Sequence, residues 1–310
     1  MVCTLLTQRF VPAPRNTRES PASQFHLGSG EDWAAFVEKA GIDNSVLFTS
    51  EGLSVGFIQL PAYAVSICRS YNDYVYERFA SVSPRLKPMA LIPMQDVPAA
   101  AQELRRAVKE LGFPGAMIPS TGLPLHLGHQ LYWPIYEEAE RLDCALAVHG
   151  GPARGMGLDT FTSMVDAHVL HHPVPLMMAL VSFIYDGVFD RFPNLRLGLM
   201  EGGCGWLPCV LDRMKRDQDH YQHFSGPRLH PVEYIAGGRV LIGVEDSEET
   251  LSYLVKRIGA QVFAYASDYP HEVDFVAAKH EIQEMTERSD LTDEEKQAIL
   301  GGNAKRFYKL

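Results

Sequence analysis

Short apolar segments alternate with amphipathic ones from Asp32 to the end of the chain. Apolar runs of roughly four to eight residues are typical of buried strands, and apolar positions three or four residues apart are typical of helices. The strands are expected at 45–49, 87–94, 115–119, 145–149, 195–201, 240–245 and 262–268, and the helices at 32–40, 62–81, 99–111, 132–142, 173–192, 207–224 and 248–258, with two more from Phe275 and Asp293. Because strands and helices alternate, the pattern predicts a parallel sheet covered by helices.

The number of strand–helix units indicates the architecture. Seven units are one fewer than a closed (β/α)8 barrel contains. We therefore predict an α/β fold, a (β/α)8 TIM-barrel-like fold that lacks or alters the first strand. Residues 1–30 carry three prolines and no regular period, so they are expected to form an irregular segment. Residues 31–310 contain no linker rich in glycine and serine and are predicted to form a single barrel domain.

Charge and composition exclude several classes of protein. The chain has 28 basic and 38 acidic residues, a formal charge of -10, which argues against nucleic-acid binding and a polybasic membrane surface. No apolar run is expected to reach the roughly 18–20 residues of a transmembrane helix, so no membrane partner is predicted. The five cysteines lack zinc-ribbon spacing and are expected to be reduced thiols, which favours a cytoplasmic protein.

Ionisable residues stand at the ends of four predicted strands: His149, Glu201, Glu245 and Asp268. The carboxyl ends of barrel strands carry the catalytic groups in this architecture. Burying a carboxylate costs several kcal/mol unless it is paired or binds a cation. Imidazole and carboxylate together suit an ion such as zinc, whose bound water can ionise near neutral pH. Glu245 is nevertheless more typical of a structural or solvated residue.

Several ordered motifs support a family assignment: LKPMALIPMQD, HGG at 149–151, GVFDRFPNLRLGLMEGGCGWLP, ASDYPHE at 266–272 and NAKRFY at 303–308. Over roughly Trp33 to Leu310 the chain resembles the amidohydrolase-related family, which includes aminocarboxymuconate semialdehyde decarboxylase and the hydroxybenzoate decarboxylases. The resemblance implies a (β/α)8 barrel with one divalent metal ion at its carboxyl end, zinc first, with manganese or iron as alternatives. It also implies that His149 and Asp268 are metal ligands.

The first departure from the family concerns the first strand, which usually carries two ligands as H-x-H or E/D-x-H. No such motif precedes Trp33, and the early histidine, His26, lies in a loop-like context. Either the coding sequence begins further upstream, or residues 1–30 leave the barrel open beside 45–49 or fill the gap with an unrelated segment. An open strand edge would favour association with another chain, so a homo-oligomer is one alternative.

The second departure concerns strand six, where the decarboxylases carry a histidine and this chain has Glu201. A carboxylate can bind metal or accept a proton, but it cannot act as an imidazolium. The sequence therefore favours hydrolysis of a small carbonyl-containing substrate by metal-activated water. The alternatives are non-oxidative decarboxylation and a catalytically impaired barrel that serves as a binding or assembly module.

Five residues form the candidate site. Asp268 is expected to bind metal and shuttle a proton, His149 to bind metal, and Glu201 to bind metal or act as the general base. His172, in the long loop after strand five, is expected to act as a substrate or metal contact in catalysis, and His271 is expected to orient Asp268. Structural alternatives stay open: a turn cap for Asp268, a core histidine for His149, and backbone hydrogen bonding for Glu201.

Overall fold

The computed structural model describes residues 28–152, 154–221, 226–271 and 273–310. The strands are β1 Ser45–Leu47, β2 Leu86–Pro88, β3 Ala90–Leu91, β4 Gly115–Pro119, β5 Ala145–His149, β6 Arg196–Met200, β7 Val240–Val244 and β8 Phe263–Tyr265. The helices are α1 Gly30–Ala40, α2 Pro61–Val75, α3 Val97–Lys109, α4 Trp133–Leu142, α5 Met164–His171, α6 Pro173–Tyr185, α7 Val188–Arg191, α8 Leu207–His220, α9 Pro231–Ala236, α10 Leu251–Ile258, α11 Phe275–Glu287, α12 Asp293–Gln297 and α13 Asn303–Tyr308.

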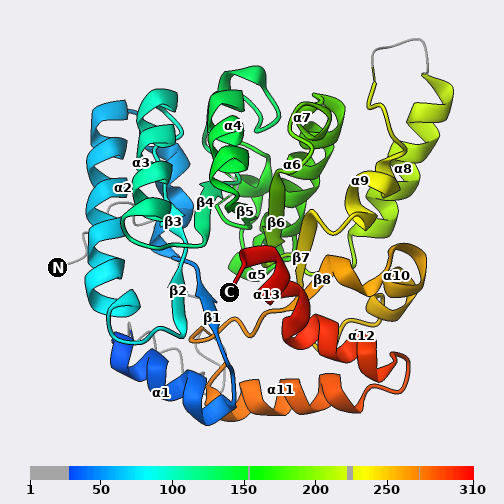
Figure 1. Ribbon diagram of the computed structural model, residues 1–310. Helices are drawn as coiled ribbons and strands as arrows, with labels where there is room; N and C mark the ends of the chain where they lie inside the picture. Colours follow the sequence, from blue (N-terminus) through cyan, green and yellow to red (C-terminus); the bar gives the residue numbers. More distant parts are fainter. Residues whose placement is uncertain (1–27, 153, 222–225, 272) are drawn as a thin grey trace.

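The strands are parallel and follow one another in chain order (Figure 1). One sheet pairs β1 with β2, and the other has the order β3-β4-β5-β6-β7-β8. Only Met89 separates β2 from β3, and its backbone N–H donates to the Leu47 carbonyl at 2.9 Å. The segment 86–91 therefore acts as one strand that pairs first with β1 and then with β4. This is the α/β, TIM-barrel-like arrangement that the alternation of strands and helices predicts.

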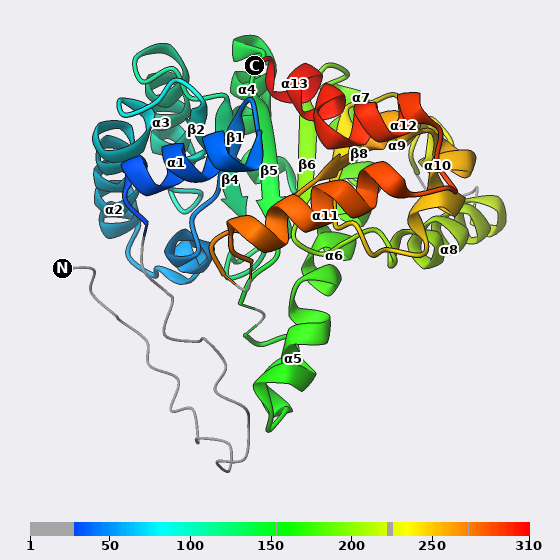
Figure 2. The ribbon, with the colours of Figure 1, turned by 90° about the horizontal axis from the view of Figure 1, so that it is seen from below.

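Between β8 and β1 the ladder is interrupted, because within the described ranges no strand pairs with either of these edges. Helix α1 lies beside α11 across this side of the molecule (Figure 2). Its Phe36 ring stacks on Tyr269, with ring centroids 3.7 Å apart, and Trp33 meets the same ring edge-on at 4.8 Å. Residues 1–27, including His26, lie outside the described residues, so the origin of the missing strand stays a prediction.

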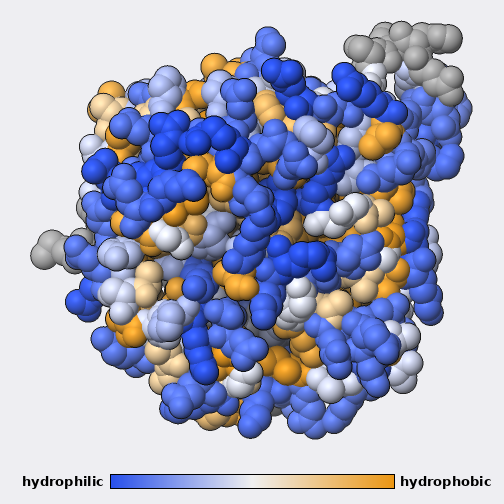
Figure 3. Space-filling model, viewed as in Figure 1, coloured by the Kyte–Doolittle hydropathy of each residue, from blue (hydrophilic) through white to orange (hydrophobic). Residues whose placement is uncertain are grey.

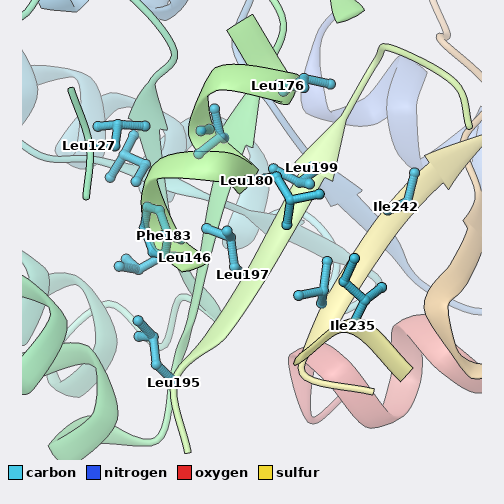
Figure 4. Packing of buried hydrophobic residues seen from close by; sticks show 14 of the residues in the cluster. Leu127, Leu146, Leu176, Leu180, Phe183, Leu195, Leu197, Leu199, Ile235 and Ile242 are labelled. Carbon is cyan, nitrogen blue, oxygen red and sulfur yellow. The ribbon is translucent and has the colours of Figure 1, made fainter. Parts of the chain in front are cut away.

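The main core lies between the strands and the outer helices (Figure 4). Leu146, Leu197 and Leu199 project from β5 and β6 toward Leu180 and Phe183 of α6, and all five are fully buried. Burying each such side chain contributes roughly 1.5–3 kcal/mol. On the side of the molecule shown in Figure 3 most of the surface is polar, as the outward-facing sides of amphipathic helices should be.

Several element boundaries differ from the sequence prediction. The helix expected at 173–192 divides into α6 and α7 because Gly187 adopts a φ of 76°, in the left-handed region. The helix expected at 62–81 is α-helical as far as Val75, the end of α2, and continues as a π-helical segment, Tyr76–Ala80. The last strand stops at Tyr265, so Asp268 lies in the loop that follows it. Helix α5 was not expected, and His172 lies between α5 and α6, not in a long loop.

One helical stretch, Val165–Tyr185, is long and apolar enough to cross a membrane by length and composition alone. This corrects the expectation that no segment passes that test. The evidence for a membrane is weak, because the core helix of a soluble protein passes it too. In this fold α6 buries Leu176, Leu180 and Phe183 against the strands, which accounts for its apolar composition.

The cysteines of the described segments, Cys68, Cys144, Cys204 and Cys209, are free thiols. Burial raises the pKa of Cys68 and of Cys144 to about 12, so both thiols stay protonated and unreactive near neutral pH. The expectation of reduced thiols agrees with these four residues, and a cytoplasmic location stays a prediction.

Replacing Asn72 with alanine should destabilise the fold by about 2–4 kcal/mol. The fully buried Asn72 side chain donates to the Leu91 carbonyl at 2.9 Å and to Glu103 at 2.7 Å, and accepts from the Leu91 N–H at 2.9 Å. Alanine would remove these bonds from the buried Leu91 N–H and carbonyl, each at a cost of about 1–3 kcal/mol, while Glu103 keeps its bonds from Arg106. Urea unfolding measures the change, with the exposed Asn194→Ala as the control. Equal stabilities for the two variants would contradict the assignment.

Candidate active site

His149 and Glu201 meet because their strands are neighbours. His149 ends β5 and pairs in register with Met200, the last residue of β6, so Glu201 directly follows that pair. The Gly150 N–H donates to the Met200 carbonyl at 3.0 Å and continues the ladder past the strand ends. His149 Nε2 consequently lies 2.6 Å from Glu201 Oε2, while His149 Nδ1 lies 2.7 Å from the Gly150 carbonyl oxygen. Both ring nitrogens of His149 therefore face oxygen acceptors.

Asp268 is linked to the opposite edge of the fold through His271. His271 Nδ1 lies 2.7 Å from Asp268 Oδ1, and His271 Nε2 lies 2.8 Å from the Ser50 hydroxyl. Ser50 follows β1, so this chain of hydrogen bonds connects the loop after β8 with the segment after β1. This contact is the one expected of a residue that orients Asp268.

Glu201 and Asp268 share an unusual backbone conformation. Their φ angles are 61° and 51°, in the left-handed region that non-glycine residues seldom occupy. Such conformations cost on the order of 1–3 kcal/mol and cluster at functional sites, where surrounding contacts hold them in place. The strained positions coincide with two of the carboxylates that the sequence singles out, which supports a functional role for both.

Three side chains form a compact set of ligand atoms. Glu201, Asp268 and His271 each offer one such atom, and these atoms all lie within 4.8 Å of one another. Two carboxylates and an imidazole are a donor set that divalent zinc, iron or manganese accepts. His149 and Asp268 both line the adjoining cavity, and each contacts a member of this set. That His149 and Asp268 bind a common ion stays a prediction.

The charge state of Glu201 follows from its neighbours. Burial alone would raise the pKa of Glu201, but the hydrogen bond from His149 and the charges of His149, His172 and His271 outweigh it. The net pKa of Glu201 therefore lies below its ordinary value, and the carboxylate is ionised at neutral pH. An ionised Glu201 is suited to binding a cation.

His172 borders the same carboxylate from the junction of α5 and α6. It is 9% exposed, and its Nε2 lies 3.5 Å from Glu201 Oε1. Burial lowers the pKa of His172 to about 4, although the Glu201 charge opposes the shift, so its ring is neutral at pH 7. Its Nδ1 is buried and makes no hydrogen bond to any described residue.

Substituting Gly150 with alanine should lower turnover by roughly 100-fold, the order of loss expected from misplacing a site residue by 1 Å. A Cβ atom at Gly150 would lie 2.5 Å from His172 Nδ1 and 2.8 Å from His172 Cα, so the junction of α5 and α6 would have to move. Initial rates measure the effect. The control is Gly205→Ala, because a Cβ there meets only Thr250, at 3.9 Å. Matching rates for the two variants would show that His172 tolerates displacement.

A cavity of about 540 Å³ adjoins these groups. His149, Glu201, Asp268 and His271 line it together with apolar side chains that include Met200, Leu241, Ala264 and Tyr308. Residues of β1 and the segment after β8 also line it, so the cavity follows the gap between these two edges. Its size and mixed lining suit a small molecule with an apolar body and a charged group.

Sequence reasoning did not identify Ser50 or His171. Ser50 directly follows a predicted strand, so the strand-end rule that selected Glu201 could have selected it. The Nε2 atom of His171 lies 2.7 Å from the Nε2 atom of His172. Because adjacent residues of a helix usually point apart, the sequence does not predict this contact.

The chain is similar to a known family and to several characterised proteins. The family model described as amidohydrolase matches residues 23–310. The 2-amino-3-carboxymuconate-6-semialdehyde decarboxylase of Dictyostelium discoideum is 30% identical over 271 residues, which cover 87% of this chain and 73% of the relative. The gamma-resorcylate decarboxylase of a Polaromonas species is 27% identical over 294 residues, covering 88% and 85% respectively.

Solved structures show the same fold. The dihydroxybenzoic acid decarboxylase of Polaromonas, solved with bound manganese and the inhibitor 2-nitroresorcinol, gives a TM-score of 0.74 at 23% identity, covering 90% of this chain and 85% of that one. The TIM-barrel-like fold and the family resemblance predicted from the motifs are thereby confirmed. The chain belongs to the amidohydrolase family and is an enzyme, either a metal-dependent hydrolase or a carboxy-lyase of that family.

Proposed function

We propose that this enzyme catalyses the non-oxidative decarboxylation of a small aromatic or conjugated carboxylic acid. The observation that carries the proposal is the set of Glu201, Asp268 and His271 beside a cavity of about 540 Å³. Relatives with the same fold and similar sequences are named as decarboxylases of such acids. They favour decarboxylation over hydrolysis, which the sequence had placed first.

The proposed cofactor is one divalent metal ion, with manganese ahead of zinc because solved relatives contain manganese. Glu201 and Asp268 would hold it, with His271 or His149 completing the protein ligands. Two ionised or ionisable carboxylates in a partly buried site fit such a cation, since they would otherwise repel each other. When bound, the ion would supply positive charge and Lewis acidity toward the substrate carboxylate.

The remaining requirement is a proton on carbon. In decarboxylation the bond from the carboxyl carbon breaks, its electron pair stays on the substrate carbon, a proton binds there and carbon dioxide leaves. Glu201 is ionised and His172 is neutral near pH 7, so neither is suited to supply the proton. His149 Nε2 lies 2.6 Å from the ionised Glu201, which places this ring with the metal-binding carboxylates. His271, which lines the cavity and is oriented by its contact with Asp268, is the proposed proton donor, and His149 then completes the metal ligands.

Hydrolysis is the second candidate, and Glu201 is the observation that favours it. An ionised carboxylate at the end of β6 can accept a proton from water, as a general base does. The residue after β6 would then act as a general base in this chain, where Glu201 replaces the histidine of the decarboxylases. A small carbonyl compound such as an ester, amide or lactone would be the substrate.

A substrate panel separates these proposals. The chelated protein is reloaded with manganese or zinc and assayed with 2,6-dihydroxybenzoate, 5-carboxyvanillate and a set of esters, amides and lactones. We expect manganese-dependent release of carbon dioxide from an acid and no hydrolysis. Hydrolysis without carbon dioxide release would make the second candidate the function. The absence of both reactions and of bound metal would favour an impaired barrel.

A further inference from the structure

Three histidine rings gather beside the candidate active site. His168, His171 and His172 each offer a ring nitrogen, and these three nitrogens lie within 4.8 Å of one another. The ring centroids are 4.7 Å apart for His168 and His171, 4.9 Å for His168 and His172, and 4.0 Å for His171 and His172. No pair is stacked face to face, since the interplanar angles range from 58° to 79°. The edges of the rings can therefore point toward a common centre.

Hydrogen bonding does not account for the whole cluster. The Nε2 atoms of His171 and His172 lie 2.7 Å apart, so one donates and the other accepts. The second nitrogen of His172, Nδ1, is buried without a hydrogen-bond partner in the described part of the chain and lies against Gly150, where an added Cβ would come within 2.5 Å of it. The His172 atom that faces the cluster is therefore Nε2, and its single hydrogen bond to His171 Nε2 joins only two of the three rings.

The backbone places the cluster where a small ion can reach it. Helix α5 projects from the body of the fold on the side where β5 ends (Figure 2). Along it the three residues pass from exposed His168 through half-buried His171 to buried His172. Positions 168, 171 and 172 are related by steps of three and four residues, which places His168 on the same face as the other two.

From this geometry we infer a second cation site, formed by His168, His171 and His172, that binds a divalent ion with an affinity for imidazole, zinc in particular. Three imidazoles plus one water make a tetrahedral zinc site in which neighbouring ligand atoms are about 3.3 Å apart, given zinc–nitrogen bonds of about 2.0–2.1 Å. The Nε2 atoms of His171 and His172 are 2.7 Å apart and all three ligand atoms lie within 4.8 Å of one another, so small rotations of the rings would bring them to that spacing. The three ligands of this group are all imidazoles, which distinguishes it from the set around Glu201 and Asp268, whose carboxylates suit harder cations such as manganese.

The proposed site adjoins the proposed catalytic metal centre through one contact. His172 Nε2 lies 3.5 Å from Glu201 Oε1. An ion held by the histidines would fix the His172 ring and thereby the position of Glu201. The site is independent of which reaction the enzyme catalyses, since its ligands are separate from Asp268 and His271.

Metal stoichiometry tests the inference. The full chain is stripped with a chelator, dialysed against micromolar free zinc, and analysed for bound zinc by mass spectrometry. We expect His168→Ala/His171→Ala to bind about one zinc ion per chain fewer than the parent. His168→Ala alone should weaken that site by more than the roughly 10–100-fold that losing an outer hydrogen-bond partner costs. Because His168 is exposed, this single variant should fold normally, and circular dichroism checks that it does.

A matched control and a second variant give the result its meaning. His126→Ala/His129→Ala removes another histidine pair three residues apart, with ring centroids 6.1 Å apart, and should bind as much zinc as the parent. Asp268→Asn should remove only the ion of the catalytic centre. The difference in zinc content between the parent and His168→Ala/His171→Ala should therefore persist even if the proposed function is wrong. Equal zinc content in the parent and His168→Ala/His171→Ala would overturn the inference.

Discussion

Replacing Asp268 with asparagine should lower turnover at least about 1,000-fold and reduce bound metal at the catalytic centre. The substitution removes a negatively charged ligand and the partner with which His271 shares a proton at 2.7 Å. Proton transfer by a positioned group alone is worth about 100–10,000-fold. Asparagine tolerates the left-handed backbone of position 268, where φ is 51°, so the loop itself should not refold. Metal analysis and initial rates on the same preparation measure both effects.

Asp274→Asn is the matched control for this substitution. Asp274 caps α11 by accepting the N–H groups of Val276 and Ala277 at 2.9 Å, and asparagine caps helices about as well as aspartate. The control should therefore keep its metal and its activity. If Asp268→Asn kept full activity and full metal content as well, Asp268 would be a turn residue only.

Replacing Glu201 with glutamine should lower metal affinity and turnover by about 100-fold or more, because even outer partners of metal ligands contribute 10–100-fold. Glutamine keeps the shape of the side chain but loses the charge that His149 contacts at 2.6 Å. The direction of the effect is the same for decarboxylation and hydrolysis, so this variant tests the site and not the reaction. Isothermal titration with manganese and initial rates measure the two losses.

Glu245→Gln provides the comparison. Glu245 follows β7, the neighbouring strand, and receives the same chemical change at an exposed position. Its effect should stay below about tenfold. Equal losses for Glu201→Gln and Glu245→Gln would mean that general electrostatics, and not a ligand, accounts for the result.

The sequence predicted the part of the site that depends on strand ends. His149 and Glu201 follow from two local facts, the apolar run before each residue and the parallel pairing of their strands. Asp268 was found for the same reason, although its strand ends three residues earlier, at Tyr265. The rule works because parallel strands bring their carboxyl ends to one edge of the sheet.

Contacts between distant segments could not be predicted in the same way. Ser50 and His271 are 221 residues apart in the chain, and no local pattern relates them. The stacking of Phe36 on Tyr269 likewise depends on how α1 crosses the gap between β1 and β8. The NAKRFY motif served in the sequence only as a family signature, and the structure gives it a role. The Asn303 amide donates to the Ala260 and Phe263 carbonyls and thereby holds β8 in place.

The preference for hydrolysis rested on one residue. This chain has Glu201 where the decarboxylases carry a histidine, and a carboxylate at that position cannot deliver a proton as an imidazolium does. In the structure Glu201 lies within reach of three histidines, His149, His172 and His271. Proton delivery therefore need not depend on the residue at the end of β6.

The origin of the hydrogen on the product tests the central claim most directly. The acid that the manganese-loaded enzyme consumes fastest is turned over in heavy water, and the products are analysed by mass spectrometry and gas measurement. Decarboxylation predicts one deuterium on the carbon that lost the carboxylate, with carbon dioxide and product released in equal amounts. A product that retains its carboxyl carbon and gains an oxygen atom from isotopically labelled water would contradict the account and establish hydrolysis.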